Sequence, residues 1–345
     1  MNLVHEPVMT RELLEYCVPA VPDGLMIDGT LGEGGHSAAF LAAHPRLRLV
    51  GVDADPTMIH RAQSRLAQFE GRTMLVQSWF DEYFARGDCG QEGSDPPAAE
   101  ADRPGPGARP RGAQVIILDL GVSMFHFRGA GRGFSLVEDG PLDMRLSPNA
   151  STTAADLVNG LSEAELADLI FRYGEERYSR RIAAAICRNR PITTSLQLAE
   201  NIRAAVPPAY RRGRLHPATR TFQALRIVVN DELARILRAL PAAATCLADG
   251  GSLGVISFHS LEDRLVKRVF RGLADPGWEP APGNRDDGVF AEDLDAELGA
   301  VRSAGRTFSL VSKKPLTPSH EEISRNPAAS SAKLRVLRCL AEAVA

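Results

Sequence analysis

The sequence predicts an α/β protein built on a parallel sheet. Short apolar runs alternate with helix-like segments along the chain, which is typical of strands joined by crossover helices. The runs are continuously apolar, as expected for strands buried on both faces. A glycine-rich turn follows the first run, and an acid ends the second. The expected strands are residues 25–29, 47–52, 73–77, 115–120 and 252–258.

Helices are expected between and beyond these strands. Asp55 and Pro56 predict a helix start, because Asp accepts hydrogen bonds at an N-cap and Pro is tolerated at the first helical position. About 130 residues separate the fourth and fifth strands, too many for one crossover helix. Four helical segments are expected there, at residues 154–159, 162–173, 179–190 and 195–206.

These segments predict a helical insertion domain within an α/β core. The insertion is placed at residues 148–215, and a crossover helix at 216–240 returns the chain to the sheet. The core then consists of residues 1–147 and 216–345.

Two stretches lack the apolar residues that a core needs. Residues 86–114 hold five prolines and six glycines, so a disordered surface loop is expected there. Residues 272–306 are similar but more acidic, and are expected to form a second mobile excursion.

Composition restricts the class of protein. The net charge of −3 gives the whole molecule no preference for nucleic acid or membranes, so any such preference must come from local clustering. The five cysteines lack any C-x-x-C spacing, which argues against a zinc site or a disulfide framework and fits a reducing cytoplasm. No apolar run approaches 18 residues, and the N-terminus shows no signal-peptide pattern. A soluble cytoplasmic protein without a metal is expected.

The glycine-rich turn is the most informative feature of the chain. Residues 25–37 read LMIDGTLGEGGHS, and residues 50–56 read VGVDADP. Glycines let the backbone approach a ligand, and Asp53 stands where the hydroxyls of a nucleotide ribose would lie. The third glycine of a dinucleotide fingerprint is absent, and the acid-x-x-x-Gly-x-Gly pattern from Asp28 resembles the S-adenosylmethionine turn of Rossmann-like methyltransferases. A turn without a ligand is the alternative.

Asp119 ends the fourth expected strand. Ligands of open parallel sheets bind outside the carboxyl ends of the strands, so Asp119 is expected beside the glycine turn and Asp53. Capping of the following turn is the alternative. Residues 129–145 come next, are rich in glycine and carry Asp139, Asp143 and Arg145, and they are expected to form a functional loop over the crevice.

His259 follows the fifth expected strand within SFHSLEDR, residues 257–264. It is a candidate general base near neutral pH, although such a histidine more often holds a loop by hydrogen bonds. No second His or Cys stands at ligand spacing, which argues against a metal site. No G-x-S-x-G motif is present, which weakens a hydrolase interpretation.

Positive charge is clustered in the insertion. Residues 171–226 contain 12 arginines and 3 acids, with Tyr173, Tyr178 and Tyr210 among them. Arginines with aromatic planes suit single-stranded or looped RNA, because phosphates are neutralised and bases stack. Solvated helix faces are the alternative, and structural roles are allowed for Arg203, Arg220 and Arg226.

The chain resembles the bacterial small-subunit ribosomal RNA (cytosine-N4)-methyltransferases over nearly its whole length. The matching segments stand in the same order along the chain: residues 5–8, 28–37, 119–123, 131–145, 173–182, 216–233, 256–270 and 326–338. The resemblance implies a Rossmann-like class I methyltransferase core with a helical insertion domain for RNA recognition. It further implies methyl transfer from S-adenosylmethionine to the exocyclic N4 of a cytidine in the decoding region, on ribosomal RNA or the assembled small subunit.

The resemblance also implies site residues. The cofactor contacts fall on Gly34, Gly35, His36, Asp53, Phe80, Asp119 and His126. Independently of the resemblance, Asp119 and His259 are the candidate catalytic residues, because they stand at or just after the ends of the fourth and fifth expected strands. The chain departs from the family pattern at Glu33, where a glycine is usual, and at Met124-Phe125-His126, where Ser-Pro-Gln is usual. The contact at His126 is therefore the least secure, and the 86–114 insert is assigned no role.

Two other functions stay open on the sequence alone. A nicotinamide-dependent oxidoreductase could share the fold, although the glycine pattern disfavours it. A non-catalytic RNA-binding assembly factor could keep the fold without turnover, although the glycine turn and Asp53 are intact.

Overall fold

The computed structural model describes residues 7–87, 89, 112–121, 131–148, 150–278, 294, 296–299, 301 and 305–341. Most of the predicted 86–114 loop, much of the 272–306 excursion and His126 lie outside these residues. The chain forms two compact units: Leu3–Gly121 with Leu233–Ala345, and residues 122–232 between them.

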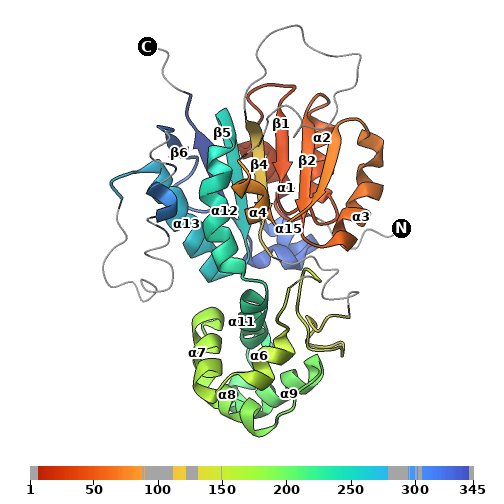
Figure 1. Cartoon of the computed structure of the whole chain (residues 1–345), viewed down its shortest axis with the longest axis vertical. Coiled ribbons are helices and arrows are strands. Elements are labelled where there is room, and N and C mark those ends of the chain that lie inside the picture. The colour runs from red at the N-terminus through yellow and green to blue at the C-terminus, as the bar shows by residue number, and fades with distance from the viewer. Residues whose placement is uncertain are drawn as a thin grey trace. The chain divides into compact units, whose positions relative to one another are not determined.

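The first unit contains a seven-stranded sheet (Figure 1). The strands are β1 (Leu25–Asp28), β2 (Arg48–Asp53), β3 (Thr73–Gln77), β4 (Ala113–Asp119), β5 (Leu247–Ser257), β6 (Phe308–Leu310) and β7 (Lys333–Cys339), in the order β3-β2-β1-β4-β5-β7-β6. The first five are parallel, and β7 runs antiparallel to both β5 and β6. The α/β class and all five predicted strands are confirmed, whereas β6 and β7 were not predicted.

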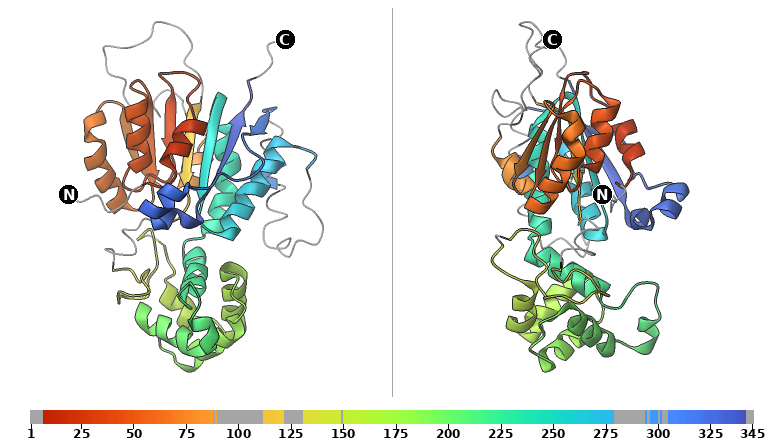
Figure 2. Two further views of the ribbon diagram at one scale, coloured as in Figure 1. Left: turned by 180° about the vertical axis from the view of Figure 1, so that it is seen from behind. Right: turned by 90° about the vertical axis from the view of Figure 1, so that its right-hand side faces the viewer.

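Helices cover both faces of this sheet (Figure 2). They are α1 (Thr10–Tyr16), α2 (Gly35–Ala43), α3 (Pro56–Leu66), α4 (Phe80–Ala85), α12 (Glu232–Thr245), α13 (Ser260–Ala274) and α15 (His320–Arg325). Helix α3 starts as predicted, since the Asp55 carboxylate accepts from the Thr57 N–H at 2.8 Å and Pro56 is its first residue. None of the helices in the described residues is both long and apolar enough to span a membrane.

The second unit is helical. Its helices are α6 (Ala154–Gly160), α7 (Glu163–Gly174), α8 (Ser179–Arg188), α9 (Ser195–Ala205), α10 (Pro208–Arg211) and α11 (Thr219–Val229). The four predicted helices, α6 to α9, are confirmed. Three of them begin with capping boxes, at Thr153, Ser162 and Thr194, in which side chain and backbone satisfy each other's hydrogen bonds.

The helical unit is wider than the predicted insertion of residues 148–215. Phe134, Leu142 and Met144 are buried in the same core as the helices, which places the segment before residue 148 in this unit. The predicted crossover helix at 216–240 is also divided, because Asp231 has a left-handed φ of 52° between α11 and α12. Helix α11 therefore belongs to the helical unit, and nearly all of α12 belongs to the sheet unit.

One cysteine pair corrects the sequence analysis, which expected no disulfide. Cys89 and Cys246 are bonded, with Cα atoms 5.4 Å apart, while Cys17, Cys187 and Cys339 are free thiols. The bonded residues are 157 positions apart in the sequence, so no local spacing could reveal the pair.

Two helix-ending glycines give a test of packing between α7 and α11. A Cβ at Gly174 would lie 2.6 Å from the Arg220 carbonyl oxygen, whereas a Cβ at Gly160 meets nothing within 4 Å. We expect Gly174→Ala to lower the free energy of unfolding by about 1–3 kcal/mol, since backbone must move. Gly160→Ala, the matched control, should raise it by about 0.5–1 kcal/mol. Urea unfolding followed by circular dichroism measures both, and equal effects would contradict the packing.

Candidate active site

The carboxyl ends of the parallel strands meet at one edge of the sheet. Strand β1 pairs with β2 on one side and β4 on the other, so the chain order reverses between β1 and β4. Ligands of open α/β sheets bind at such a switch point. The predicted residues Asp53 and Asp119 end β2 and β4 and are both at this edge.

Asp53 braces the glycine turn. One of its carboxylate oxygens accepts from the Gly32 N–H at 2.8 Å, and the other accepts from the Asp55 N–H at 2.8 Å. The turn needs glycines because Gly32 and Gly34 have φ values of 51° and 74°, and Gly34 leads directly into α2. The Asp53 carboxylate therefore holds the backbone of the glycine turn and the start of α3 together.

Packing also requires the next glycine. A Cβ at Gly35 would lie 2.7 Å from an Arg65 guanidinium nitrogen and 3.0 Å from Pro7 Cγ. The neighbouring Glu33 is buried and pairs with Arg61 at 2.9 Å and Arg65 at 3.9 Å. The acid that replaces the usual glycine of the family is thus accommodated by two arginines from α3.

Asp28 is a buried acid at the end of β1. Its carboxylate accepts from the Ser37 hydroxyl at 2.7 Å and from the Thr30 N–H at 3.3 Å. Burial, with a smaller contribution from the Asp53 charge, raises the pKa of Asp28 to about 6 against the lowering effect of these two hydrogen bonds.

Asp119 is held at the end of β4 by its backbone, whose N–H donates to the Thr30 hydroxyl at 2.6 Å. Its Oδ1 is buried and has no hydrogen-bond partner among the described residues. Burial, followed by the charges of Asp28 and Glu262, holds the pKa of Asp119 well above its usual range. A buried carboxylate oxygen without a partner is costly, so it marks a position where a ligand can donate a hydrogen bond.

His36 lies beside Asp119. Its Nε2 is 2.8 Å from the Val8 carbonyl oxygen, so Nε2 carries the proton in that hydrogen bond. Its Nδ1 is 3.8 Å from Asp119 Oδ2. The first residues of α2 therefore bring a buried imidazole to the acid at the end of β4.

Phe80 begins α4, just after β3. A Cβ at Gly29 would lie 3.5 Å from Phe80 Cβ and 2.6 Å from a Leu118 methyl carbon. Glycine at position 29 thus lets the half-buried Phe80 approach the turn after β1, and its contact with a cofactor stays a prediction.

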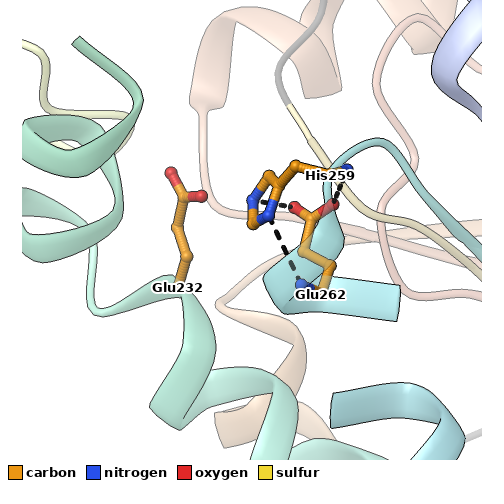
Figure 3. A group of neighbouring side chains, drawn as sticks. All are labelled: Glu232, His259 and Glu262. Atoms are coloured by element: carbon orange, nitrogen blue, oxygen red, sulfur yellow. Dashed lines mark hydrogen bonds and ion pairs between the residues drawn. The ribbon is translucent and has the colours of Figure 1, made fainter. Parts of the chain in front are cut away.

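His259 caps helix α13 (Figure 3). Its Nδ1 accepts from the Glu262 N–H at 3.4 Å, and its Nε2 is 3.1 Å from Glu262 Oε1. The other Glu262 oxygen accepts from the Phe258 and His259 N–H groups. This geometry supports the loop-holding alternative, and a catalytic role for His259 stays a prediction. Figure 3 also shows Glu232, which accepts two hydrogen bonds from Arg226.

The functional loop predicted at residues 129–145 is described from residue 131 onward. Residues 131–145 belong to the helical unit, where Arg145 forms two hydrogen bonds to the Asp143 carboxylate. Thr30 and Val8, which hold Asp119 and His36, were missed by sequence reasoning, because a hydroxyl and a carbonyl group leave no pattern in the sequence.

The structure separates the arginines of residues 171–226 into two groups. Several have structural partners: Arg190, Arg211 and Arg220 donate to backbone carbonyls, Arg226 pairs with Glu232, and Arg172 and Arg203 form exposed ion pairs. Six others are exposed and make no hydrogen bond or ion pair within the described ranges: Arg177, Arg180, Arg181, Arg188, Arg212 and Arg214. The structural roles allowed for Arg220 and Arg226 are confirmed.

The strand order with a reversed β7, the glycine turn and the acid ending β2 define a Rossmann-like class I methyltransferase core. The sequence comparisons agree with this class. The model of the MraW methylase family matches residues 2–340, and the chain belongs to this family.

Its relatives are similar along their whole length. The ribosomal RNA small subunit methyltransferase H of Treponema denticola is 44% identical over 342 residues, covering 98% of each chain. That of Treponema pallidum is 46% identical over 367 residues, covering 97% of this chain and 92% of the relative. That of Synechococcus elongatus is 41% identical over 332 residues, covering 96% and 93%.

The raised pKa of Asp28 predicts a pH-dependent stability. An acid whose pKa is higher when folded stabilises the protein below its unfolded pKa, and this contribution is lost as pH rises through the folded pKa. We expect the stability advantage of Asp28→Asn over the wild type to grow by up to about 3 kcal/mol between pH 4 and pH 7.

Denaturant unfolding followed by tryptophan fluorescence measures this difference. Both tryptophans, Trp79 and Trp278, lie in the sheet unit, so the signal reports on the unit that contains Asp28. A difference that stays constant across this pH range would contradict the burial of an ionisable Asp28.

Proposed function

We propose that this protein transfers a methyl group from S-adenosylmethionine to the exocyclic N4 of a cytidine in the decoding region of small-subunit ribosomal RNA. The observation that carries the proposal is the buried Asp119 oxygen without a partner among the described residues, at the switch point beside the glycine turn. Membership in a methylase family and relatives that are named ribosomal RNA methyltransferases support it.

The residues of the crevice fit this cofactor. The Gly32–Gly35 turn is braced by Asp53, an acid at the end of β2, the position that meets ribose hydroxyls in nucleotide-binding folds. Phe80 offers an aromatic face for a purine ring next to the same turn. His36 and Asp119 complete the predicted contacts within the described residues, and the buried acids favour a cationic ligand. When bound, S-adenosylmethionine supplies a methyl group made electrophilic by its sulfonium charge.

The cytosine amino nitrogen is a weak nucleophile, because its lone pair is delocalised into the ring. Asp119 accepts a hydrogen bond from this amino group and orients its lone pair. Orientation of reacting groups can contribute about 7–11 kcal/mol to catalysis, so a strong base is not required. The amine becomes acidic as it gains the methyl group, and Asp119 is placed to accept the proton that leaves.

The RNA must present its target base to the crevice. A cytosine within a helix is inaccessible, so the base flips or lies single-stranded, at an unstacking cost of a few kcal/mol. Exposed arginines of the helical unit, Arg180, Arg181, Arg212 and Arg214, supply positive charge for phosphates. This surface is compatible with naked ribosomal RNA and with the assembled small subunit.

A methylase family favours methyl transfer over hydride transfer, so the oxidoreductase alternative receives no support. A non-catalytic assembly factor would keep cofactor binding without methyl transfer, and the experiment below separates it from an enzyme.

Two variants test the crevice. Asp53→Ala should mainly raise the Kd for S-adenosylmethionine, because it removes both the ribose acceptor and the brace on Gly32. Asp119→Ala should lower the rate of methyl transfer at saturating cofactor by about 100-fold or more, the scale of general acid–base and positioning effects. Isothermal titration gives the Kd, and labelled S-adenosylmethionine with unmodified small subunits gives the rate.

Asp119→Asn is the matched control, since it keeps the shape and one acceptor oxygen but cannot take a proton. An intermediate rate for Asp119→Asn indicates that both orientation and proton transfer contribute. Wild-type turnover in both alanine variants would show that the crevice is assigned wrongly.

Two variants of His259 separate its role as a helix cap from a catalytic role of its imidazole. Asn is a good N-cap residue, so the His259→Asn variant should keep both helix α13 and the methyl-transfer activity of the protein. His259→Ala should lower the free energy of unfolding by about 1 kcal/mol. Thermal unfolding and the methyl-transfer rate are measured on both variants. Loss of activity in a stable His259→Asn variant would instead assign catalysis to the imidazole.

A further inference from the structure

Three side chains of the helical unit form an aromatic and cationic cluster on its surface. The exposed guanidinium of Arg177 lies over the Tyr178 ring at 4.8 Å and over the Tyr210 ring at 5.4 Å. The two rings are 5.1 Å apart and nearly perpendicular, at 78°. We call Arg177, Tyr178 and Tyr210 the Arg177 platform. Arg177 makes no hydrogen bond or ion pair with other described residues, so its charge is not neutralised there.

The buried acid Glu176 holds part of the Arg177 platform by hydrogen bonds. Glu176 is fully buried; it accepts from the Tyr178 N–H at 2.8 Å and from the Tyr210 hydroxyl. Burial, together with this hydrogen bond, raises the pKa of Tyr210 to about 12, so its hydroxyl keeps its proton. Burying a charged acid is costly unless its hydrogen bonds are made. Here those bonds join the α7–α8 turn to α10, and they hold the Tyr178 backbone and the Tyr210 hydroxyl on one carboxylate.

Unpaired arginines flank the platform along the chain on both sides. Arg180 and Arg181 lie in the first turn of α8, two and three residues after Tyr178, and that turn contains no acid. Arg212 and Arg214 follow α10, immediately after Tyr210 and Arg211. Cations at a helix N-terminus oppose the helix dipole, so the arginines of α8 do not stabilise their own helix. Their position is explained by an anionic partner.

We infer that the Arg177 platform binds a single-stranded RNA segment, with a base stacked on the platform and the adjacent phosphates held by the flanking arginines. The inference rests on the proposed function and adds a contact outside the catalytic crevice. A flat cation over two oriented rings suits a nucleobase, since stacking needs planar faces and tolerates any base. Arginines next to it suit the phosphates on either side of that base.

The alternative of solvated helix faces predicts a different arrangement. Exposed arginines that serve only solubility need no buried acid beneath them and no aligned rings. The structural arginines of the same unit, such as Arg190 and Arg226, are held by carbonyls or acids, whereas Arg177, Arg180, Arg181, Arg212 and Arg214 have no such partner among the described residues. The Arg177 platform therefore combines an aromatic ring held by the buried Glu176 with an exposed guanidinium that has no acid beside it.

The test uses the full chain and a short fluorescein-labelled single-stranded RNA, with binding followed by fluorescence anisotropy. Arg177→Ala should weaken binding about tenfold, the scale of losing one stacked base. Arg177→Lys keeps the charge but not the planar face, and should recover only part of the loss. Arg188→Ala, the matched control, removes the same charge from the other end of α8 and should change the Kd about twofold or less.

Salt dependence separates phosphate binding from stacking. The Arg180→Ala/Arg181→Ala double variant should reduce the slope of log K against log salt by about 0.7 for each phosphate that is no longer neutralised. Arg177→Lys should leave this slope unchanged. If Arg177→Lys binds the RNA with the same Kd as the wild type, the inference that a base stacks on the platform is wrong.

Methyl transfer distinguishes failure of this inference from failure of the proposed function. Arg177→Ala should raise the KM for RNA and leave the cofactor Kd and the thermal unfolding midpoint unchanged. If the wild type methylates ribosomal RNA but Arg177→Ala has the same KM and Kd for RNA as Arg188→Ala, RNA binding by the Arg177 platform is refuted and the proposed function is not. A wild type that transfers no methyl group to ribosomal RNA would overturn the proposed function.

Discussion

The hydrogen bond from the Gly32 N–H to the Asp53 carboxylate ties the turn after β1 to the end of β2. A second bond, from the Asp119 N–H to the Thr30 hydroxyl, ties the same turn to the end of β4. Parallel strands bring these ends to one edge, but they do not fix the loops that follow. The two bonds do so, and the conformation of the glycine turn and the position of the Asp119 carboxylate both depend on them.

The acids gathered at this edge repel one another, and their environments give them different roles. Asp28 is satisfied by Ser37 and Thr30, and Glu262 accepts from two backbone N–H groups at the start of α13. Asp119 keeps a buried oxygen for which the described residues offer no donor. Two of the acids therefore have structural partners, and the third is the one that we propose contacts the substrate. The cost of burying them together is offset when a cationic cofactor and an amino group arrive.

The sequence predicts those features of the fold and the site that depend on local pattern. Strands β1 to β5 are apolar runs and were predicted, whereas β7 alternates apolar residues with Lys333, Arg335 and Arg338 and was not. The extent of the helical unit was missed because Phe134 and Leu142 come from a glycine-rich segment without helical periodicity. In the site, Asp53 and Asp119 follow from strand ends, but the bracing of the turn depends on contacts between distant residues.

The most direct test of this account is methyl transfer to small ribosomal subunits that lack the modification. Labelled S-adenosylmethionine is supplied, the RNA is digested, and mass spectrometry identifies the labelled nucleoside. The account predicts that the label is found in N4-methylcytidine. Label in a different nucleoside would contradict the N4 assignment while leaving a methyltransferase. No label in the RNA, with an active control enzyme beside it, would contradict the central claim that this crevice methylates ribosomal RNA.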